Sequence, residues 1–162
     1  MKNIVSFFLD FTFIDSLAFL NASLDELMKD LVEYKNHPFT ILDQTNLYAK
    51  GSNLKELLLR KGVFCYDYCT SLKRMKNTKK LPSQKDFYSK LKEEEISLED
   101  YEHAKKVFKE FKCGSLLEYA EIYCLSDVAS LCEVFIQFRK LIYENFGLDC
   151  AWYISTPQVK TE

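Results

Sequence analysis

Residues 115–147 read SLLEYAEIYCLSDVASLCEVFIQFRKLIYENFG and predict the longest helix of the chain. Ser115 and Glu118 have the spacing of a capping box, in which a side-chain oxygen and a carboxylate three residues later satisfy the first free N–H groups of a helix. Apolar residues then recur with helical spacing from Leu116 to about Phe146, and Gly147 is typical of a helix end. The sequence therefore predicts one long helix in its last third.

Three more Ser-x-x-acid patterns open apolar-periodic stretches, at residues 23–26, 83–86 and 97–100. The first predicts a helix from about Leu24 to Tyr34. That helix should end before Pro38, because the residue before a proline is pushed out of helical geometry. The other two patterns predict helices between residues 83 and 115.

The remaining segments are less regular. Residues 53–60 give a weaker helical pattern. Residues 62–82 are first aromatic and then basic, which favours a connecting segment with little regular structure. The start, from Ile4 to Ile14, is rich in Phe, Ile and Val with partial alternation, which favours one or two strands. The expected fold is mostly α with a short N-terminal β element.

Length, composition, net charge and cysteine content limit the classes of protein to which the chain can belong. The chain has 162 residues, of which 48% are hydrophobic and 15% aromatic, so one globular domain with a buried core is expected. The net charge of −2 means that any nucleic-acid contact must come from a local patch. The six cysteines are scattered among helical patterns without a secretory signal, which favours reduced, intracellular thiols. No apolar run approaches the roughly 20 residues of a membrane helix.

One pair of residues in the long helix could take part in catalysis. Tyr123 and Asp127 stand four apart, so a helix places the phenol and the carboxylate on one face. Such a carboxylate can hold a divalent ion, and the phenol can orient an attacking water. The spacing is common by chance, however, and a solvent-edge pair on an amphipathic helix is the alternative interpretation.

Several unlike segments carry a resemblance in their order and spacing. They are the runs at residues 61–68, 81–91 and 100–105, then Tyr123-x-x-x-Asp127, with residues 13–24 upstream. Together they resemble protein-primed family B DNA polymerases of viral, organellar and transposon origin, over roughly residues 11–157. The resemblance implies that residues 1–157 form the C-terminal part of a ribonuclease-H-like α/β 3′–5′ exonuclease domain, followed by a divergent tail at residues 158–162.

The resemblance also implies catalytic roles. Asp127 matches the metal-binding aspartate of the third exonuclease motif, and Tyr123 matches the tyrosine that positions the nucleophile. Lys61 matches a lysine that assists the exonuclease. The metal of such an enzyme is Mg²⁺ or Mn²⁺, and we expect this chain not to bind it stably.

A second set of residues matches the ligands of the single-stranded primer end in that family: Ser16, Leu17, Leu20, Phe64 and Tyr66. Hydroxyl groups can bond phosphate, and aromatic rings can stack on unpaired bases. Ser16 could equally be an ordinary strand-end hydroxyl, and Tyr66 could be a core residue. We expect Ser16, Lys61, Tyr66 and the basic run from Lys73 to Lys80 to form one weak, salt-dependent site for single-stranded DNA.

The departures from the family limit the expected activity. The first motif supplies an Asp-x-Glu pair on a strand and the second another aspartate, both upstream of the part that this chain matches. Asp100-Tyr-Glu102 has the letters of the first motif but lies in a predicted helix, where residues two apart point away from each other. The polymerase palm would follow Ser155-Thr-Pro157, where the sequence diverges. We therefore expect no polymerase activity and little or no exonuclease activity.

Two hypotheses follow. The first is a part of a DNA-directed DNA polymerase, from its proofreading region, with DNA as partner and with terminal protein or the remaining polymerase domains as further partners. The second is a non-catalytic helical module that binds DNA or protein and derives from a mobile element. A nuclear, mitochondrial or viral context stays open. A zinc site is not expected, because Cys65 and Cys69 lack a second pair of ligands at suitable spacing.

Overall fold

The structure is a computed structural model that describes residues 15–34, 37–48 and 53–153. Contacts within the chain divide it into two compact units, and each is considered by itself. The larger unit comprises residues 23–137, and the smaller one comprises residues 1–22 together with 138–162. The strands predicted over Ile4–Ile14 and the tail at 158–162 lie outside the described residues.

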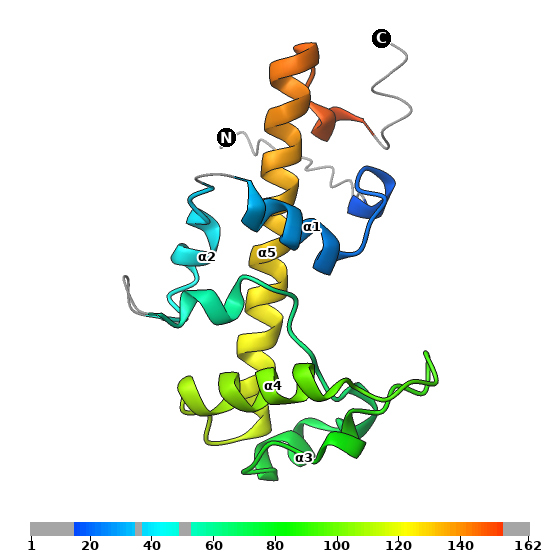
Figure 1. The fold of residues 1–162 in the computed structure, drawn as a ribbon, viewed down its shortest axis with the longest axis vertical. Helices are drawn as coiled ribbons and strands as arrows, with labels where there is room; N and C mark the ends of the chain where they lie inside the picture. Colours follow the sequence, from blue (N-terminus) through cyan, green and yellow to red (C-terminus); the bar gives the residue numbers. More distant parts are fainter. Residues whose placement is uncertain (1–14, 35–36, 49–52, 154–162) are drawn as a thin grey trace, which may run out of the picture. The chain divides into compact units, whose positions relative to one another are not determined.

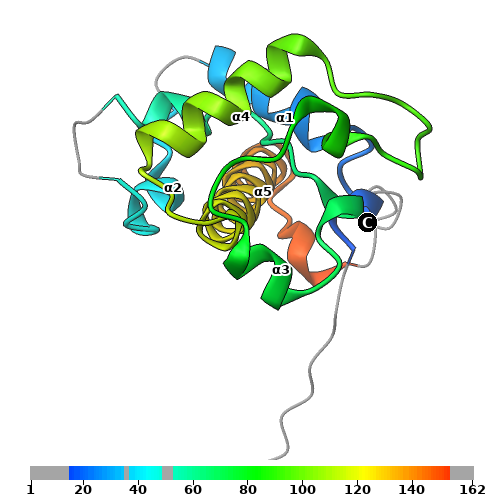
Figure 2. The ribbon, with the colours of Figure 1, turned by 90° about the horizontal axis from the view of Figure 1, so that it is seen from below.

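The described part is mostly helical, as the sequence predicts, and its only β feature is an isolated antiparallel bridge between Ser89 and Glu94. The α-helices are α1 (Leu24–Glu33), α2 (Thr40–Gln44), α3 (Leu72–Asn77), α4 (Leu98–Glu110) and α5 (Leu116–Phe146). Short 3-10 helices are η1 (Ser16–Ala18), η2 (Lys55–Leu58), η3 (Tyr66–Tyr68), η4 (Gln84–Phe87) and η5 (Cys150–Trp152). Figure 1 shows α4 and α3 near the N-terminal part of α5. Figure 2, a view along α5, shows α4 and α3 on opposite sides of it.

The predicted caps of the main helices are confirmed. Ser23 and Glu26 form a capping box at α1, in which the Glu26 N–H donates to Ser23 Oγ and the Ser23 N–H donates to Glu26 Oε2 at 2.9 Å. Ser97 caps α4 by accepting a hydrogen bond from the Asp100 N–H. α5 ends at Phe146, and Gly147 follows with a φ of 68°, a left-handed conformation that glycine adopts without steric cost.

Three other expectations need correction. Residues 53–60 form only the 3-10 helix η2, and the capping box at Ser83 opens the short η4 rather than a longer helix. Residues 62–82, expected to have little regular structure, contain η3 and α3. α3 forms because Ser71 accepts a hydrogen bond from the Arg74 N–H, which supplies a local cap that the basic composition of the segment obscured.

A buried carboxylate accounts for α2, which the sequence did not predict. Phe39, at the N-cap, has a φ of 50° and makes no side-chain cap. Instead Glu133 Oε1, from α5, accepts hydrogen bonds from the N–H groups of Ile41 at 2.6 Å and Leu42 at 3.1 Å. Glu133 is only 3% exposed, and its Oε2 lies 4.0 Å from His37 Nε2. Tertiary contact thus replaces the local capping signal.

The core of the larger unit lies between α5 and the segments around it. One buried cluster comprises Leu57, Cys65, Phe87, Ala104, Val107, Cys113, Leu116 and Tyr119. These residues come from η2, from the segment before η3, from η4 and α4, from the turn between α4 and α5, and from the start of α5. The core therefore fixes the segment that begins at Lys61 against α5.

The smaller unit has its own packing. The rings of Phe19 and Phe138 lie 6.4 Å apart between centroids. Arg139 forms a two-point ion pair with Asp149, with Nε donating to Oδ1 at 2.6 Å, and Cys150 beside it is fully buried. All six cysteines of the chain are free thiols. Among the described helices, none is both long enough and apolar enough to span a membrane.

We expect Glu133→Ala to lower the free energy of unfolding by about 1–3 kcal/mol, because two N–H groups of α2 would lose their acceptor, one of them buried. Glu133→Gln, which keeps a carbonyl oxygen, should lose less. Chemical denaturation measures both effects, and hydrogen exchange at Ile41 and Leu42 reports α2 directly. Glu121→Ala, at an exposed position of the same helix, is the control and should change stability little.

Candidate functional site

One face of α5 carries the central residues of the candidate site. Tyr119, Tyr123 and Asp127 follow each other at intervals of four, so the helix sets them on successive turns of one face. Tyr119 is buried, whereas Tyr123 and Asp127 are half-buried. The pairing of Tyr123 with Asp127 that the spacing predicted is present.

The segment from Lys61 to Tyr66 lies against this face. The Tyr119 hydroxyl donates a hydrogen bond to the Val63 carbonyl at 2.7 Å. At Gly62 a Cβ atom would approach Tyr123 Cδ2 to 2.9 Å, closer than real Cβ contacts allow. The absence of a side chain at Gly62 therefore lets the backbone pass directly beside the Tyr123 ring.

Four rings from these two segments, Phe64, Tyr66, Tyr119 and Tyr123, form what we call the aromatic cluster. Phe64 is nearly parallel to Tyr123 and Tyr119, with centroid distances of 5.2 and 6.1 Å. Tyr66 stands edge-on to Phe64 at 5.3 Å and to Tyr123 at 6.1 Å. Both arrangements are favourable geometries for aromatic pairs. The cluster thus holds Tyr66 in place although that residue is 67% exposed.

A chain of hydrogen bonds joins the cluster to Asp127. The hydroxyl groups of Tyr66 and Tyr123 lie 2.6 Å apart. Tyr123 also bonds to the carboxylate of Asp127. A carboxylate can only accept, so Tyr123 donates to Asp127 and accepts from Tyr66. The hydrogen bonds therefore run in one direction, with Tyr66 donating to Tyr123 and Tyr123 donating to Asp127.

Burial governs the electrostatics of this chain. Desolvation raises the pKa of Asp127, while the hydrogen bond from Tyr123 and the positive charge of Lys61 oppose that rise. Desolvation also raises the pKa of Tyr123, and its bonds to Tyr66 and Asp127 raise it further. Tyr123 is therefore a neutral hydrogen-bond donor at physiological pH. Lys61 is exposed, and its positive charge acts to lower the pKa of Asp127.

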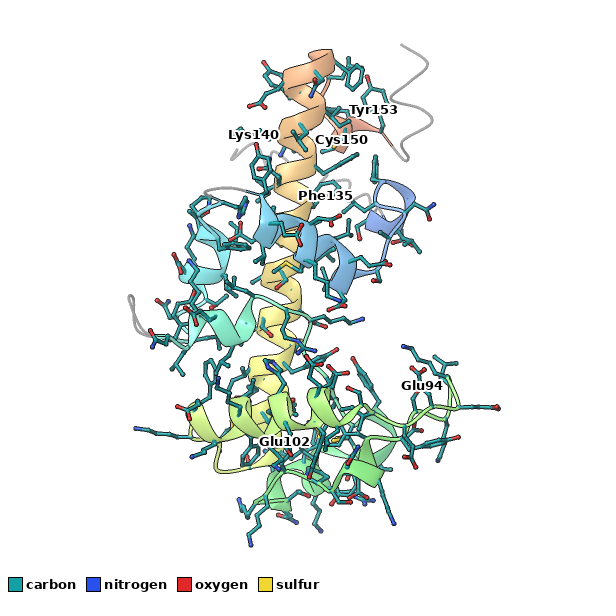
Figure 3. All side chains as sticks on the ribbon, viewed as in Figure 1. Glu94, Glu102, Phe135, Lys140, Cys150 and Tyr153 are labelled. Atoms are coloured by element: carbon teal, nitrogen blue, oxygen red, sulfur yellow. The ribbon has the colours of Figure 1, made fainter. Side chains whose placement is uncertain are left out.

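A cleft of about 430 Å³ opens beside the aromatic cluster. It is lined by residues 61–64, Tyr66 and Tyr123 and by residues from Phe87 to Asp100. Figure 3 shows Glu94 on the loop that precedes α4, and this loop closes into the bridge between Ser89 and Glu94. The cleft thus offers aromatic rings and Lys61 from one segment. The other segment contributes Lys92 and three carboxylates, those of Glu94, Glu95 and Asp100.

The groups at the cleft are suited to binding a ligand. The exposed ring of Tyr66 can stack on a flat ligand, and Lys61 can pair with an anion. In the part of the chain that is described, no group of three or more His, Cys, Asp or Glu side chains could hold a metal ion.

The structure brings together five of the eight predicted site residues. Lys61, Phe64, Tyr66, Tyr123 and Asp127 lie in one place in the larger unit. The other three belong to the smaller unit: Ser16, Leu17 and Leu20. There Asp15 caps η1 by accepting from the Leu17 N–H, Leu17 is exposed, and Leu20 is buried.

Sequence reasoning missed two positioning residues. Tyr119 anchors the segment at Val63, and Gly62 permits its close approach. Tyr119 could have been found, because it stands four residues before Tyr123 on the same predicted helix face. The neighbourhood of Gly62 depends on tertiary packing and carried no local signal. Tyr66, for which a core position was considered, is at the surface.

Asp100-Tyr-Glu102 is in a helix, as predicted, and its two carboxylates diverge. Asp100 pairs with Arg60, whereas Glu102 accepts from Lys105 Nζ at 2.6 Å. Figure 3 places the labelled Glu102 on α4. The sulfurs of Cys65 and Cys69 lie 3.9 Å apart as free thiols. Neither pair forms a metal site among the residues that the structure covers.

Comparison of the chain with protein-family models, with curated proteins and with solved structures found no match. The geometry of the site and the resemblance in the sequence are therefore the observations on which a function can be argued.

We expect Asp127→Asn to stabilise the chain at neutral pH. The pKa of Asp127 is raised in the folded state, so its favourable contribution is present at low pH and is lost as the pH rises through that pKa. Asparagine keeps an acceptor for Tyr123 without the buried charge. Unfolding by denaturant should show a variant advantage at pH 7 that shrinks toward pH 4. Asp30→Asn, on the exposed face of α1, should show no such trend.

Proposed function

We propose that this chain is part of the 3′–5′ exonuclease domain of a protein-primed family B DNA polymerase, and that its cleft binds the single-stranded 3′ end of DNA. The finer fold that accompanies this proposal is a partial ribonuclease-H-like domain. The chain would contribute the third exonuclease motif and the ligands of the strand, while the earlier motifs would come from sequence that the resemblance does not cover.

One observation carries the proposal. Lys61 and Tyr123 match separate motifs of that family and stand 62 positions apart in the sequence, yet both line one cleft together with Tyr66. Asp127 is a further matched position. A hydrogen bond from Tyr123 and the positive charge of Lys61 both act to lower its pKa. Residues that belong to different motifs of one active site should converge in this manner.

The chemistry of the cleft suits a single strand. Tyr66 presents an exposed face on which an unpaired base can stack, and its hydroxyl is already held by Tyr123. Lys61 can neutralise one phosphate. Because stacking depends little on base identity, binding should show weak sequence preference.

We expect two contributions to the binding of single-stranded DNA in the cleft, base stacking on Tyr66 and phosphate neutralisation by Lys61, and two variants separate them. Tyr66→Ala should weaken binding at every salt concentration, by about 1–3 kcal/mol for one stacked base, without changing the salt dependence. Lys61→Ala should make the negative slope of log affinity against log salt shallower by about 0.7, the share of one phosphate. Fluorescence anisotropy with a labelled oligonucleotide of five nucleotides measures both.

Matched controls are available for both variants. Tyr143→Ala removes a tyrosine of similar exposure (64%) in the smaller unit, and Lys106→Ala removes an exposed lysine of α4. Neither should alter binding of the short oligonucleotide. If the two cleft variants bind as the parent chain does, the cleft is not a DNA site.

We expect the 162-residue chain by itself to show no Mg²⁺- or Mn²⁺-dependent degradation of a 5′-labelled single strand. Two-metal hydrolysis needs several carboxylates around ions roughly 4 Å apart, and Asp127 is the one carboxylate matched to that role. Gel electrophoresis of the labelled strand measures this. Degradation that Asp127→Ala abolishes would contradict the expectation and show that the chain is catalytic.

The non-catalytic helical module is the second candidate, and it would make the same prediction of no hydrolysis. The single Asp127 carboxylate, bonded to Tyr123, favours it over an independent enzyme. Loss of binding in Tyr66→Ala and Lys61→Ala supports the exonuclease-derived site, whereas unchanged binding in both variants favours a helical module that binds DNA or protein elsewhere.

A further inference from the structure

A second surface of the larger unit is strongly positive. Between Asp67 and Asp86 the chain has no acidic residue, and α3 with the residues after it carries five exposed cations. We call these five residues the basic face: Lys73, Arg74, Lys76, Lys79 and Lys80. The net charge of the whole chain is −2, so the positive charge is concentrated here rather than spread over the surface.

The cations of the basic face make no close ion pair, although the charge of Lys79 helps to lower the pKa of Glu118. Within residues 15–34, 37–48 and 53–153, none of the five forms an ion pair, whereas Lys29, Lys55 and Lys90 each pair with an aspartate. The two aspartates that bound the segment are engaged as well. Asp67 accepts from the Lys90 N–H, and Asp86 accepts from the N–H and hydroxyl of Ser83.

The basic face is held in a fixed shape. Ser71 caps the start of α3, and Thr78 bonds back to the Arg74 carbonyl at its end. The Thr78 carbonyl accepts from the Leu116 N–H at 2.8 Å, which ties this segment to the first turn of α5. The like charges are thus kept together by the fold rather than left to separate on a loose tail.

The basic face also carries a stacked guanidinium. The Arg74 guanidinium lies 4.0 Å from the centroid of the Tyr68 ring, a cation–π contact that holds it in one orientation. A guanidinium fixed in this way presents several donors together, a geometry that suits the oxygens of a phosphate. None of residues 72–80 lines the cleft, so the expectation that this basic run shares the site of Lys61 and Tyr66 needs correction: its cations lie outside the cleft.

We propose that the basic face binds the phosphodiester backbone of nucleic acid, without reading its bases, as a contact outside the cleft. Regularly repeated phosphates match closely spaced cations, and each neutralised phosphate releases a counterion. An anionic membrane is the less favoured occupant. α3 has only six residues, with Leu72 its one large exposed apolar side chain, which leaves little apolar surface to insert in lipid.

The test uses the full chain and two triple variants that remove equal charge. Lys73→Gln/Lys76→Gln/Lys80→Gln changes the basic face, and Lys106→Gln/Lys109→Gln/Lys112→Gln changes three exposed lysines at the end of α4. A labelled single strand of 24 nucleotides and a duplex of 24 base pairs serve as probes. Circular dichroism of each variant checks that the helices remain.

The basic-face triple should make the negative slope of log affinity against log salt shallower, by about 2 with the single strand and by nearly 3 with the duplex. The α4 triple should leave both slopes unchanged. A Lys→Arg triple at 73, 76 and 80 should restore binding, because it restores charge. The probe that the parent chain binds more tightly at the same salt concentration shows which of the two backbones the basic face prefers.

Equal losses in the two Gln triples would overturn the proposal, because net charge rather than a site would then explain binding. Binding of phosphatidylserine vesicles that depends on residues 73, 76 and 80, without dependence of the oligonucleotides, would assign the surface to a membrane instead. The cleft is tested separately by Tyr66→Ala on the five-nucleotide strand, so failure of one site does not entail failure of the other.

Discussion

The hydrogen bond from Tyr119 to the carbonyl oxygen of Val63 holds the candidate site together. Tyr119 is 3% exposed, and a buried hydroxyl without a partner is costly. Val63 lies in a segment without regular structure, where its carbonyl has no ladder to join. One bond satisfies both groups and fixes Phe64 and Tyr66 against α5. The stacked rings and the link from Tyr66 to Tyr123 follow from that placement.

The parts of the fold that the sequence predicted are those whose causes are local. The cap at Ser97 and the helix end at Gly147 involve groups within about one turn, so the residue types alone are enough to predict them. α2 could not be predicted, because its N–H groups bond to Glu133, 91 and 92 residues away. α3 has a local cap at Ser71, but the aromatic and basic composition of its segment favours irregular structure.

The candidate site divides in the same way. Helix periodicity was enough to place Tyr123 beside Asp127. The approach of Lys61 to that pair came from the resemblance alone, since no periodicity relates positions 62 residues apart. What the sequence could not supply is the reason for the approach, which lies in Gly62 and in the bond that Tyr119 makes. The placement of Ser16 beside these residues stays a prediction.

Two charge arrangements in this chain work against folding, and both point toward binding. A half-buried Asp127 loses hydration, which raises its pKa, and the cations clustered at residues 73–80 repel one another. An anionic strand that neutralises the basic face and a cation that approaches Asp127 would each remove one of these costs. A ligand that binds only the folded state stabilises it in proportion to its affinity, so nucleic acid on either surface should couple binding to stability.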